Sequence, residues 1–316
     1  MKTYLFIIFI GFTASASAQQ IALTSQYLFN EMLVNPGATG AKDYIPIQLN
    51  YRKQWVNYPG SPTTQSASCH AMLSDEMAIG GLFFNDVAGP SRRTGFDFNT
   101  AYHLKLDSRR THQIGFGLGI SLTQHMIDVN QLTTYLPEDP AVLRGFNNQL
   151  VPDANVGVYY HYKNRGYAGI SAHNLVQLKR DLYDYNIPFT NPLVRTYYLL
   201  AGYNFVLNER FLLKTSTLAQ MIETTNFQVD GSLILEYKRV FWMGTSYRHK
   251  DAIVAMIGGQ IGPMRIGYSY DYTLSDIGDY SSGSHEVFLE YQVFSRLNRR
   301  SKTPWLKRNR IYSPRY

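Results

Sequence analysis

The residues of this 316-residue chain that could do chemistry are few and scattered. Cys69 is followed by His70, but neighbouring side chains on a strand point to opposite faces, so the two do not form a metal pair. Asp276 and Asp279 in SDIGDYSSG could contact calcium, although two carboxylates without an ordered ligand pattern more often serve turn geometry. No local motif therefore predicts a metal or cofactor site.

An acid–base site would have to be assembled from several strands, as in a barrel lipase. The candidates that share the polar face of the expected strands are Asp97, His103, Asp153, His161, Arg265, Asp271, Glu286 and Glu290. Polar residues of both signs are also what the wet interior of any large barrel needs. We therefore predict that the protein is not an enzyme and that it uses no cofactor or metal.

The elements that carry these residues are expected to be β-strands. In RTGFDFNTAYHLKL, residues 93–106, the side chains alternate between an apolar and a polar face. The apolar face holds Phe96, Phe98, Tyr102 and Leu104, and the polar face holds Asp97, Asn99, His103 and Lys105. The apolar face would be the core of a soluble sandwich, but it would face lipid in an outer-membrane barrel.

The number of strands and the lengths of their connections favour the barrel. Runs with a period of two cover residues 45–56, 64–73, 77–85, 93–106, 112–125, 153–163, 167–174, 194–207, 211–221, 225–238, 240–247, 252–261, 264–273 and 285–294. Each is near the roughly 9 to 11 residues that a tilted membrane strand requires. Tight turns alternate with longer excursions at 57–63, 86–92, 126–152, 175–193, 248–251 and 274–284. Outer-membrane barrels with both termini in the periplasm show this alternation.

We therefore predict an all-β fold, a transmembrane antiparallel β-barrel of about 14 strands over residues 45–294, with the apolar faces toward lipid. In QIGFGLGIS the inward positions are Gly115, Gly117 and Gly119. A nucleotide-binding glycine motif would be followed by a helix, which this stretch is not. The glycines instead let the strands bend or let something inside the barrel approach the wall.

The two ends of the chain differ from the barrel in composition. Residues 1–18 combine one basic residue, an apolar stretch and a small-residue end, as a cleaved signal peptide does, and the stretch is shorter than the roughly 20 residues of a membrane anchor. Residues 295–316 are expected to be a basic periplasmic tail. This tail holds eight of the 30 basic residues, so the net charge of +7 belongs to it and says little about nucleic acid.

The segment before the first strand, residues 19–44, is different in kind. Thr24 or Ser25 could cap a short helix, and Asn35-Pro36-Gly37 would end it. The segment would be either a periplasmic arm or a plug folded into the lumen.

Two stretches in the N-terminal part resemble the signature of the PorP/SprF family, outer-membrane proteins of the type IX secretion system. They are SQYLFNEMLVNPGATG, residues 25–40, and LNYRKQWVNYPGSPTT, residues 49–64. The resembling residues are Gln26, Tyr27, Asn30, Asn35, Pro36, Gly40, Tyr51, Arg52, Gln54, Trp55, Val56, Pro59, Gly60, Pro62 and Thr64. One departure is Gly37-Ala38-Thr39, where the family usually has an Ala-Tyr-Ala-like run.

The resemblance implies a component of the cell outer membrane that exports and attaches large surface proteins, such as gliding adhesins. It would recognise the C-terminal domain of the cargo and associate with periplasmic or peptidoglycan-linked secretion components. The loops 126–152 and 175–193 would offer a surface for cargo, and the tail would offer one in the periplasm.

The alternative function is a transporter for small or hydrophobic solutes, which the glycine-lined wall and a plug at residues 21–40 would suit. For the secretion barrel we expect the corner at residues 52–64 to be rigid. Trp55 would hold the strand end at the interface, and Pro59, Gly60 and Pro62 would fix the loop.

Overall fold

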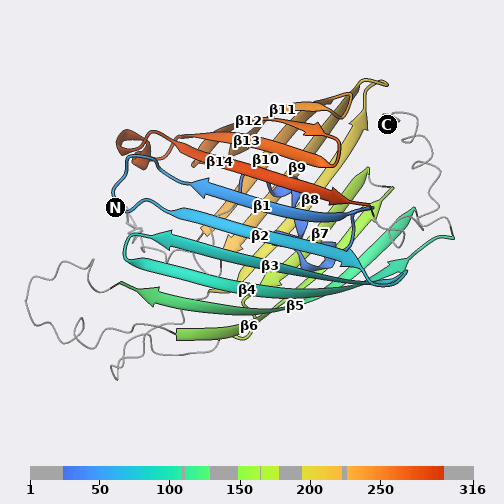
Figure 1. The fold of residues 1–316 in the computed structure, drawn as a ribbon, viewed down its shortest axis with the longest axis horizontal. Helices are drawn as coiled ribbons and strands as arrows, with labels where there is room; N and C mark the ends of the chain where they lie inside the picture. Colours follow the sequence, from blue (N-terminus) through green and yellow to red (C-terminus); the bar gives the residue numbers. More distant parts are fainter. Residues whose placement is uncertain are drawn as a thin grey trace, which may run out of the picture.

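The structure is a computed structural model that describes residues 24–108, 111–128, 149–163, 165–177, 194–222 and 226–294. In these residues fourteen antiparallel strands close into a barrel, in which each strand pairs with its neighbours along the chain and β1 pairs with β14 (Figure 1). The strands are β1 Ile45–Lys53, β2 Thr63–Met72, β3 Met77–Ala88, β4 Ser91–Lys105, β5 His112–Ile127, β6 Gln149–Tyr162, β7 Gly166–His173, β8 Thr196–Val206, β9 Phe211–Ile222, β10 Asn226–Tyr237, β11 Phe241–Arg248, β12 Ala252–Ile261, β13 Met264–Thr273 and β14 Ser284–Val293. The predicted barrel is confirmed, and a two-sheet sandwich is excluded because the sheet closes on itself.

The two faces of the strands follow the predicted alternation. On β4 the outward Phe96 and Phe98 are 47% and 46% exposed, whereas the inward Asp97, Asn99 and His103 are buried. Successive side chains on a strand point to opposite sides of the sheet, so the same pattern runs around the barrel. The outer surface is therefore apolar and suited to lipid, and the polar side chains lie inside. No helix of the described residues is long and apolar enough to cross a membrane.

The two ends of the barrel differ in their connections. One end, which we call the loop end, carries the connections 54–62, 89–90, 249–251 and 274–283. The other end, the turn end, carries the connections 73–76, 163–165, 207–210, 238–240 and 262–263. In Figure 1 the loop end is on the left, where β1 ends and the short 3-10 helix η5 (Asp276–Tyr280) lies, and the turn end is on the right, where β14 ends.

The long excursion predicted at residues 86–92 is wrong. Strands β3 and β4 continue through Asp86 and Arg93, and only residues 89–90 connect them. The charged side chains stay in the strands because they pair inside the barrel, where Arg93 Nη2 lies 2.6 Å from Asp86 Oδ2.

The excursion predicted at residues 248–251 is also a short turn. Arg248 is the last residue of β11 and is buried inside the barrel, so three residues, 249–251, remain between β11 and β12. Most of the excursions predicted at 126–152 and 175–193 lies outside the described residues, as do the predicted signal peptide and basic tail.

Residues 24–44 form a plug inside the lumen, which decides between the two positions that the sequence left open. In Figure 1 this segment is the blue coil seen behind the strands. It contains three single-turn 3-10 helices, η1 Tyr27–Phe29, η2 Glu31–Leu33 and η3 Pro36–Ala38. Tyr27, Leu28, Phe29 and Met32 are buried and form the core of the molecule together with inward residues of the wall.

The predicted helix with a cap at Thr24 or Ser25 is therefore wrong. Asn30 and Asn35 interrupt the plug with extended φ values of −143° and −147°. No side chain caps η1 itself, since Thr24 accepts only the N–H of Gln26, the residue before η1, and the hydroxyls of Thr24 and Ser25 both bond to carboxylates of the barrel wall. Tertiary contacts thus override the local helix signal.

Candidate functional site

The plug begins in a network of buried charges near the loop end. The hydroxyl of Ser25 lies 3.0 Å from both carboxylate oxygens of Asp271. The backbone N–H of Ser25 donates to Glu286 over 2.8 Å. Arg52 joins these groups, because its guanidinium donates to Ser25 Oγ (2.9 Å), Glu286 (3.0 Å) and Asp271 (2.7 Å). Arg248 approaches from the other side and donates to Ser25 Oγ over 3.1 Å. Two arginines and two carboxylates therefore hold one serine of the plug.

Tyr27 extends this network to β10. Its hydroxyl donates to Asp230 over 3.2 Å and lies 3.3 Å from Ser232 Oγ. Asp230 in turn lies 3.4 Å from Arg248. The amide of Gln26 is buried beside this network, and neither of its side-chain atoms has a hydrogen-bond partner among the described residues.

An aromatic cluster follows in the middle of the lumen. The ring of Phe29 lies 4.9 Å from that of Trp242 and 5.3 Å from that of Phe288, measured between centroids. The Arg265 guanidinium and the Lys214 ammonium lie 5.3 Å and 5.6 Å from the Phe29 ring, distances at which cations are attracted to aromatic faces. The plug thus fills the lumen with apolar as well as charged contacts.

The Asn35-Pro36-Gly37 turn lies directly on the backbone of the wall. Asn35 accepts the N–H of Gly37 (2.8 Å), and its amide donates to the carbonyls of Val158 (3.0 Å) and Ile170 (3.2 Å). The facing wall positions are Gly115, Gly117, Gly157 and Gly169, and a Cβ at any of them would overlap atoms of the plug or of its neighbours. The prediction that the inward glycines let something inside the barrel approach the wall is confirmed for Gly115 and Gly117, whereas a Cβ at Gly119 would meet the wall side chain of Asn99.

The last part of the plug is fixed toward the turn end. The N–H of Gly40, a residue with φ of +79°, donates to His70 Nδ1 over 3.0 Å, and His103 Nε2 lies 2.6 Å from the Thr39 carbonyl oxygen. Lys42 lies 3.5 Å from Glu31 of the plug. Its ammonium also lies 3.7 Å from a carboxylate oxygen of Glu290 in the wall. Asn30, the remaining signature residue of the plug, donates to Ser68 over 2.8 Å.

The second part of the predicted signature forms the loop 54–62 at the rim. The Gln54 N–H donates to the Pro62 carbonyl (2.9 Å), and Gly60 accepts the N–H of Gly89 from the neighbouring turn (2.8 Å). On the other side the Val56 N–H donates to the carbonyl of Gly283, and the Val56 carbonyl accepts the N–H of Ser282, both over 2.8 Å. The loop is therefore bonded to connections on both of its sides.

Four other signature residues take different positions at this rim. Trp55 is partly buried and Gly60 is exposed, and both have left-handed backbones, with φ of 47° and 71°. Pro59 is exposed at the tip of the loop. Thr64 at the start of β2 donates to Asp86 over 2.7 Å. The signature is thus divided into a lumen part and a rim part, and Arg52 lies between them.

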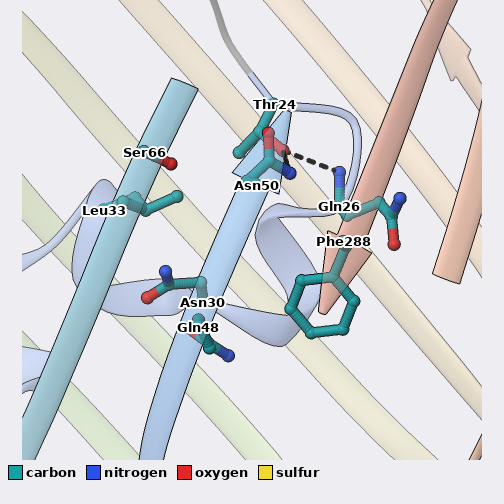
Figure 2. A pocket seen from close by; sticks show the side chains of 8 residues that line it. All are labelled: Thr24, Gln26, Asn30, Leu33, Gln48, Asn50, Ser66 and Phe288. Atoms are coloured by element: carbon teal, nitrogen blue, oxygen red, sulfur yellow. Dashed lines mark hydrogen bonds between the residues drawn. The ribbon is translucent and has the colours of Figure 1, made fainter. Parts of the chain in front are cut away.

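A small cavity lies between the plug and strands β1, β2 and β14. It is lined by Thr24, Gln26, Asn30, Leu33, Gln48, Asn50, Ser66 and Phe288 (Figure 2). Figure 2 also shows the hydrogen bond from the Gln26 N–H to Thr24 Oγ1, 3.2 Å long. The cavity has a volume of about 10 Å³, which is room for about one water molecule. This cavity is therefore too small for a solute.

Four of the residues considered for catalysis make structural contacts in this arrangement. Asp271 and Glu286 pair with Arg52, Glu290 accepts from Gln48 over 2.5 Å, and His103 contacts the plug. Among the described residues, no three His, Cys, Asp or Glu side chains are grouped so that they could hold a metal ion. Cys69 lies on the outer face and His70 inside, so the two point apart as predicted.

Sequence reasoning missed Asp230 and Arg248. The two are directly paired across β10 and β11, and both are buried at inward positions. Asp230 lies in the predicted strand 225–238, whereas Arg248 falls in the predicted excursion 248–251. The missing information was strand register, which places Asp230 beside Arg248, so that Asp230 bonds Tyr27 and Arg248 bonds Ser25 of the plug.

Comparison with known proteins gives one family. The family model for "Type IX secretion system membrane protein PorP/SprF" matches residues 16–291. A search of curated proteins finds no match for the chain.

Solved structures resemble the chain at low identity. The CymD monoaromatic hydrocarbon channel is 13% identical, with 90% of this chain and 96% of that chain covered and a TM-score of 0.49. The toluene transporter TbuX of Ralstonia pickettii is 9% identical, with 83% and 92% covered and a TM-score of 0.48. The KdgM porin is 9% identical, with 78% and 98% covered and a TM-score of 0.37.

Proposed function

Because this chain belongs to the PorP/SprF family of type IX secretion system membrane proteins, we propose that it takes part in the export and surface attachment of cargo proteins such as gliding adhesins. The step that we assign to it is recognition of the C-terminal domain of the cargo at the loop end of the barrel. We assign it a role in binding and not in catalysis, since Asp271 and Glu286 are paired with Arg52 and His103 contacts the plug.

The observation that carries this proposal is the set of backbone hydrogen bonds that fix the loop 54–62 at the rim of the barrel. The loop 54–62 is held by hydrogen bonds to both neighbouring connections, so its exposed side chains have a fixed position. Tyr58 in this loop is 41% exposed, and Tyr280 in η5 is 73% exposed. Aromatic side chains on a rigid support bind a folded partner with little loss of conformational entropy.

The proposed orientation follows from the connections. Outer-membrane barrels keep their short turns on the periplasmic side, so the turn end faces the periplasm and the loop end faces outward. Strand β14 ends at the turn end, and the tail of residues 295–316 then starts in the periplasm, where it would meet secretion components. The periplasmic amino terminus stays a prediction, because residues 1–23 lie outside the described residues. The contact of Thr24 with Glu286 near the loop end favours the outer side instead.

Cargo display in cells tests the proposal. A strain that lacks this protein should lose its surface cargo, and the unchanged protein should restore it. The double substitution Trp55→Ala and Pro59→Ala should leave the barrel in the membrane but reduce display, because it removes the fixed loop. Phe96→Leu on the lipid-facing side of β4 is the matched control and should restore display fully. Complete cargo display in the deletion strain would refute the proposal.

Purification tests the proposed partners directly. With an affinity tag between residues 175 and 193 and the tail left free, mild-detergent extraction should bring down large exported proteins that share a C-terminal domain, or periplasmic secretion components. A barrel that purifies alone would instead favour the transporter.

A transporter function would be favoured by movement of the plug. The cavity between the plug and strands β1, β2 and β14 holds about one water molecule, so a solute could use this space only after displacement of residues 24–44. Conductance that rises when these residues are deleted, together with uptake by the intact protein, would support that function. A silent intact barrel would count against it.

A further inference from the structure

Three consecutive connections at the turn end carry basic side chains. The connection 163–165 has Lys163 and Arg165, the connection 207–210 has Arg210, and the connection 238–240 has Lys238 and Arg239. They join β6 to β7, β8 to β9 and β10 to β11, so they follow one another around one side of the rim.

Three of these basic residues occupy backbone positions that suit other residue types. Lys163, Lys238 and Arg239 have φ of 48°, 49° and 59°. The Val240 N–H donates to the Tyr237 carbonyl over 3.0 Å and closes a two-residue turn with both central residues left-handed. Such a turn favours Asn and Gly. The chain therefore keeps cations at positions of these turns where the backbone geometry favours Asn and Gly.

The lysine ammonium groups lie against the outer side of the barrel. Lys163 Nζ is 5.0 Å from the ring centre of Tyr162, and Lys238 Nζ is 5.3 Å from that of Tyr237. Both tyrosines lie on the outward side of their strands, since the preceding residues, His161 and Glu236, are buried inside. The cations thus lie over aromatic rings at the level where a barrel meets the polar edge of a bilayer.

The three connections are also fixed relative to their neighbours. The Lys238 N–H donates to the Arg210 carbonyl (2.6 Å), and the Asn204 N–H donates to the Arg165 carbonyl (2.6 Å). The connection 207–210 also carries Glu209, but the connection 73–76 at the same end differs in having Asp75 and Glu76 and no basic residue. Hydrogen bonds from Tyr102 and Lys105 lower the pKa of Glu76, so it stays ionised. The basic character thus belongs to the β6–β11 side.

We propose that Lys163, Arg165, Arg210, Lys238 and Arg239 bind the phosphate groups of anionic phospholipids in the leaflet at the turn end. Preorganised cations over an aromatic belt suit a phosphate that carries acyl chains, because the chains can lie on the apolar wall below. This site is independent of cargo recognition, and it would fix the depth and tilt of the barrel in the membrane.

The test uses the full-length protein in nanodiscs that contain phosphatidylglycerol or phosphatidylcholine, with native mass spectrometry of the lipids that stay bound after release. The variant is the triple substitution Lys163→Asn, Lys238→Asn and Arg239→Gly. It should retain phosphatidylglycerol less well by on the order of tenfold, since each cation near a membrane surface contributes substantially to attraction. Its melting temperature should be unchanged or higher, because the new residues fit the left-handed backbone.

Two variants serve as controls. Lys250→Asn makes the same change at a left-handed residue of the loop end, where φ is 60°, and should leave phosphatidylglycerol retention unchanged. The double substitution Lys163→Arg and Lys238→Arg keeps the charges and should also retain the lipid.

Equal phosphatidylglycerol retention by the triple variant and the unchanged protein would overturn the proposal. An equal loss in Lys250→Asn would overturn it too, since the effect would then come from total charge. Unchanged lipid retention with loss of a co-purifying acidic periplasmic protein would assign the cations to a protein partner instead.

Discussion

Two walls of the same lumen hold the plug by different physics. The wall of β1, β10, β11, β13 and β14 offers the charged groups Arg52, Asp230, Arg248, Asp271 and Glu286. The wall of β5, β6 and β7 offers glycines, on which the plug backbone lies directly. The first wall selects the plug by directional bonds and the second selects it by shape. Removal of single bonds from the charged wall should therefore weaken the binding of the plug step by step. A single side chain that fills the glycine wall should instead displace the plug completely.

The largest effect is expected from filling the glycine wall. The substitution Gly117→Val places a branched side chain where Pro36 and Gly37 now lie, and the wall backbone cannot move without breaking its strand pairs. We expect the plug to leave the lumen while the barrel still closes. Single-channel conductance should rise, and protease should cut the plug in the purified barrel.

The matched control for this experiment is Gly231→Ala on β10. Gly231 is exposed on the outer face, and a Cβ there would meet nothing within 4 Å. It should leave conductance and protease resistance unchanged. A Gly117→Val barrel that stays closed and resistant would show that the glycine wall does not position the plug.

Breaking the charged wall should cost less. The substitution Arg52→Gln leaves Asp271 and Glu286 buried with a weaker partner, and removal of one member of a buried ion pair typically costs about 3–5 kcal/mol. The measurement is the urea dependence of unfolding of the barrel in detergent. Arg92→Gln is the control, because Arg92 is exposed and its change should cost about 0–1 kcal/mol. Equal losses for both variants would contradict a special role for the buried charges.

A smaller loss is expected where the plug donates to the glycine wall. Asn35→Ala removes the bonds to Val158 and Ile170 together with the cap of Gly37, and loss of such a cap costs about 0.5–2 kcal/mol. Conductance should stay low, because the shape of the plug is kept. Asn208→Ala, which removes the bonds to the turn residues Arg210 and Phe211 outside the lumen, separates this effect from the general loss of a turn bond. A rise in conductance for Asn35→Ala would show that this bond and not the fit holds the plug.

The barrel was predictable from the sequence because apolar and polar side chains alternate along each strand. This alternation can be read from neighbouring residues alone. The predicted strand boundaries were wrong where a strand continues through a charged residue, as at Asp86 and Arg93. A charged residue near Gly and Pro resembles a loop in the sequence, but these two side chains form an ion pair inside the barrel. The sequence left the position of residues 24–44 open and predicted a single helix in them, because the bonds to distant carboxylates that override the helix signal of residues 24–34 are not part of any local pattern. Asp230 and Arg248 could not be assigned to the plug without strand register.

The smallest effect, Tyr27→Phe, tests whether the charged wall acts as one unit. The substitution removes the hydrogen bond to Asp230, but Asp230 still accepts from Ser246 over 2.5 Å and from Ser232 over 3.0 Å. No buried charge is left without a partner, so the free energy of unfolding should fall by about 0.5–1.5 kcal/mol.

Combining this change with the two larger ones sharpens the comparison of the walls. Tyr27 and Arg52 reach the same Arg248 network, through Asp230 and Asp271, so their double variant should depart from additivity by at least about 0.5 kcal/mol. Tyr27 and Asn35 lie on different walls and share no partner, so their losses should add within about 0.5 kcal/mol. Urea unfolding of the three single and two double variants measures both sums. Strong coupling between Tyr27 and Asn35 would mean that the plug moves as one rigid piece. The charged wall and the glycine wall would then not hold the plug independently of each other.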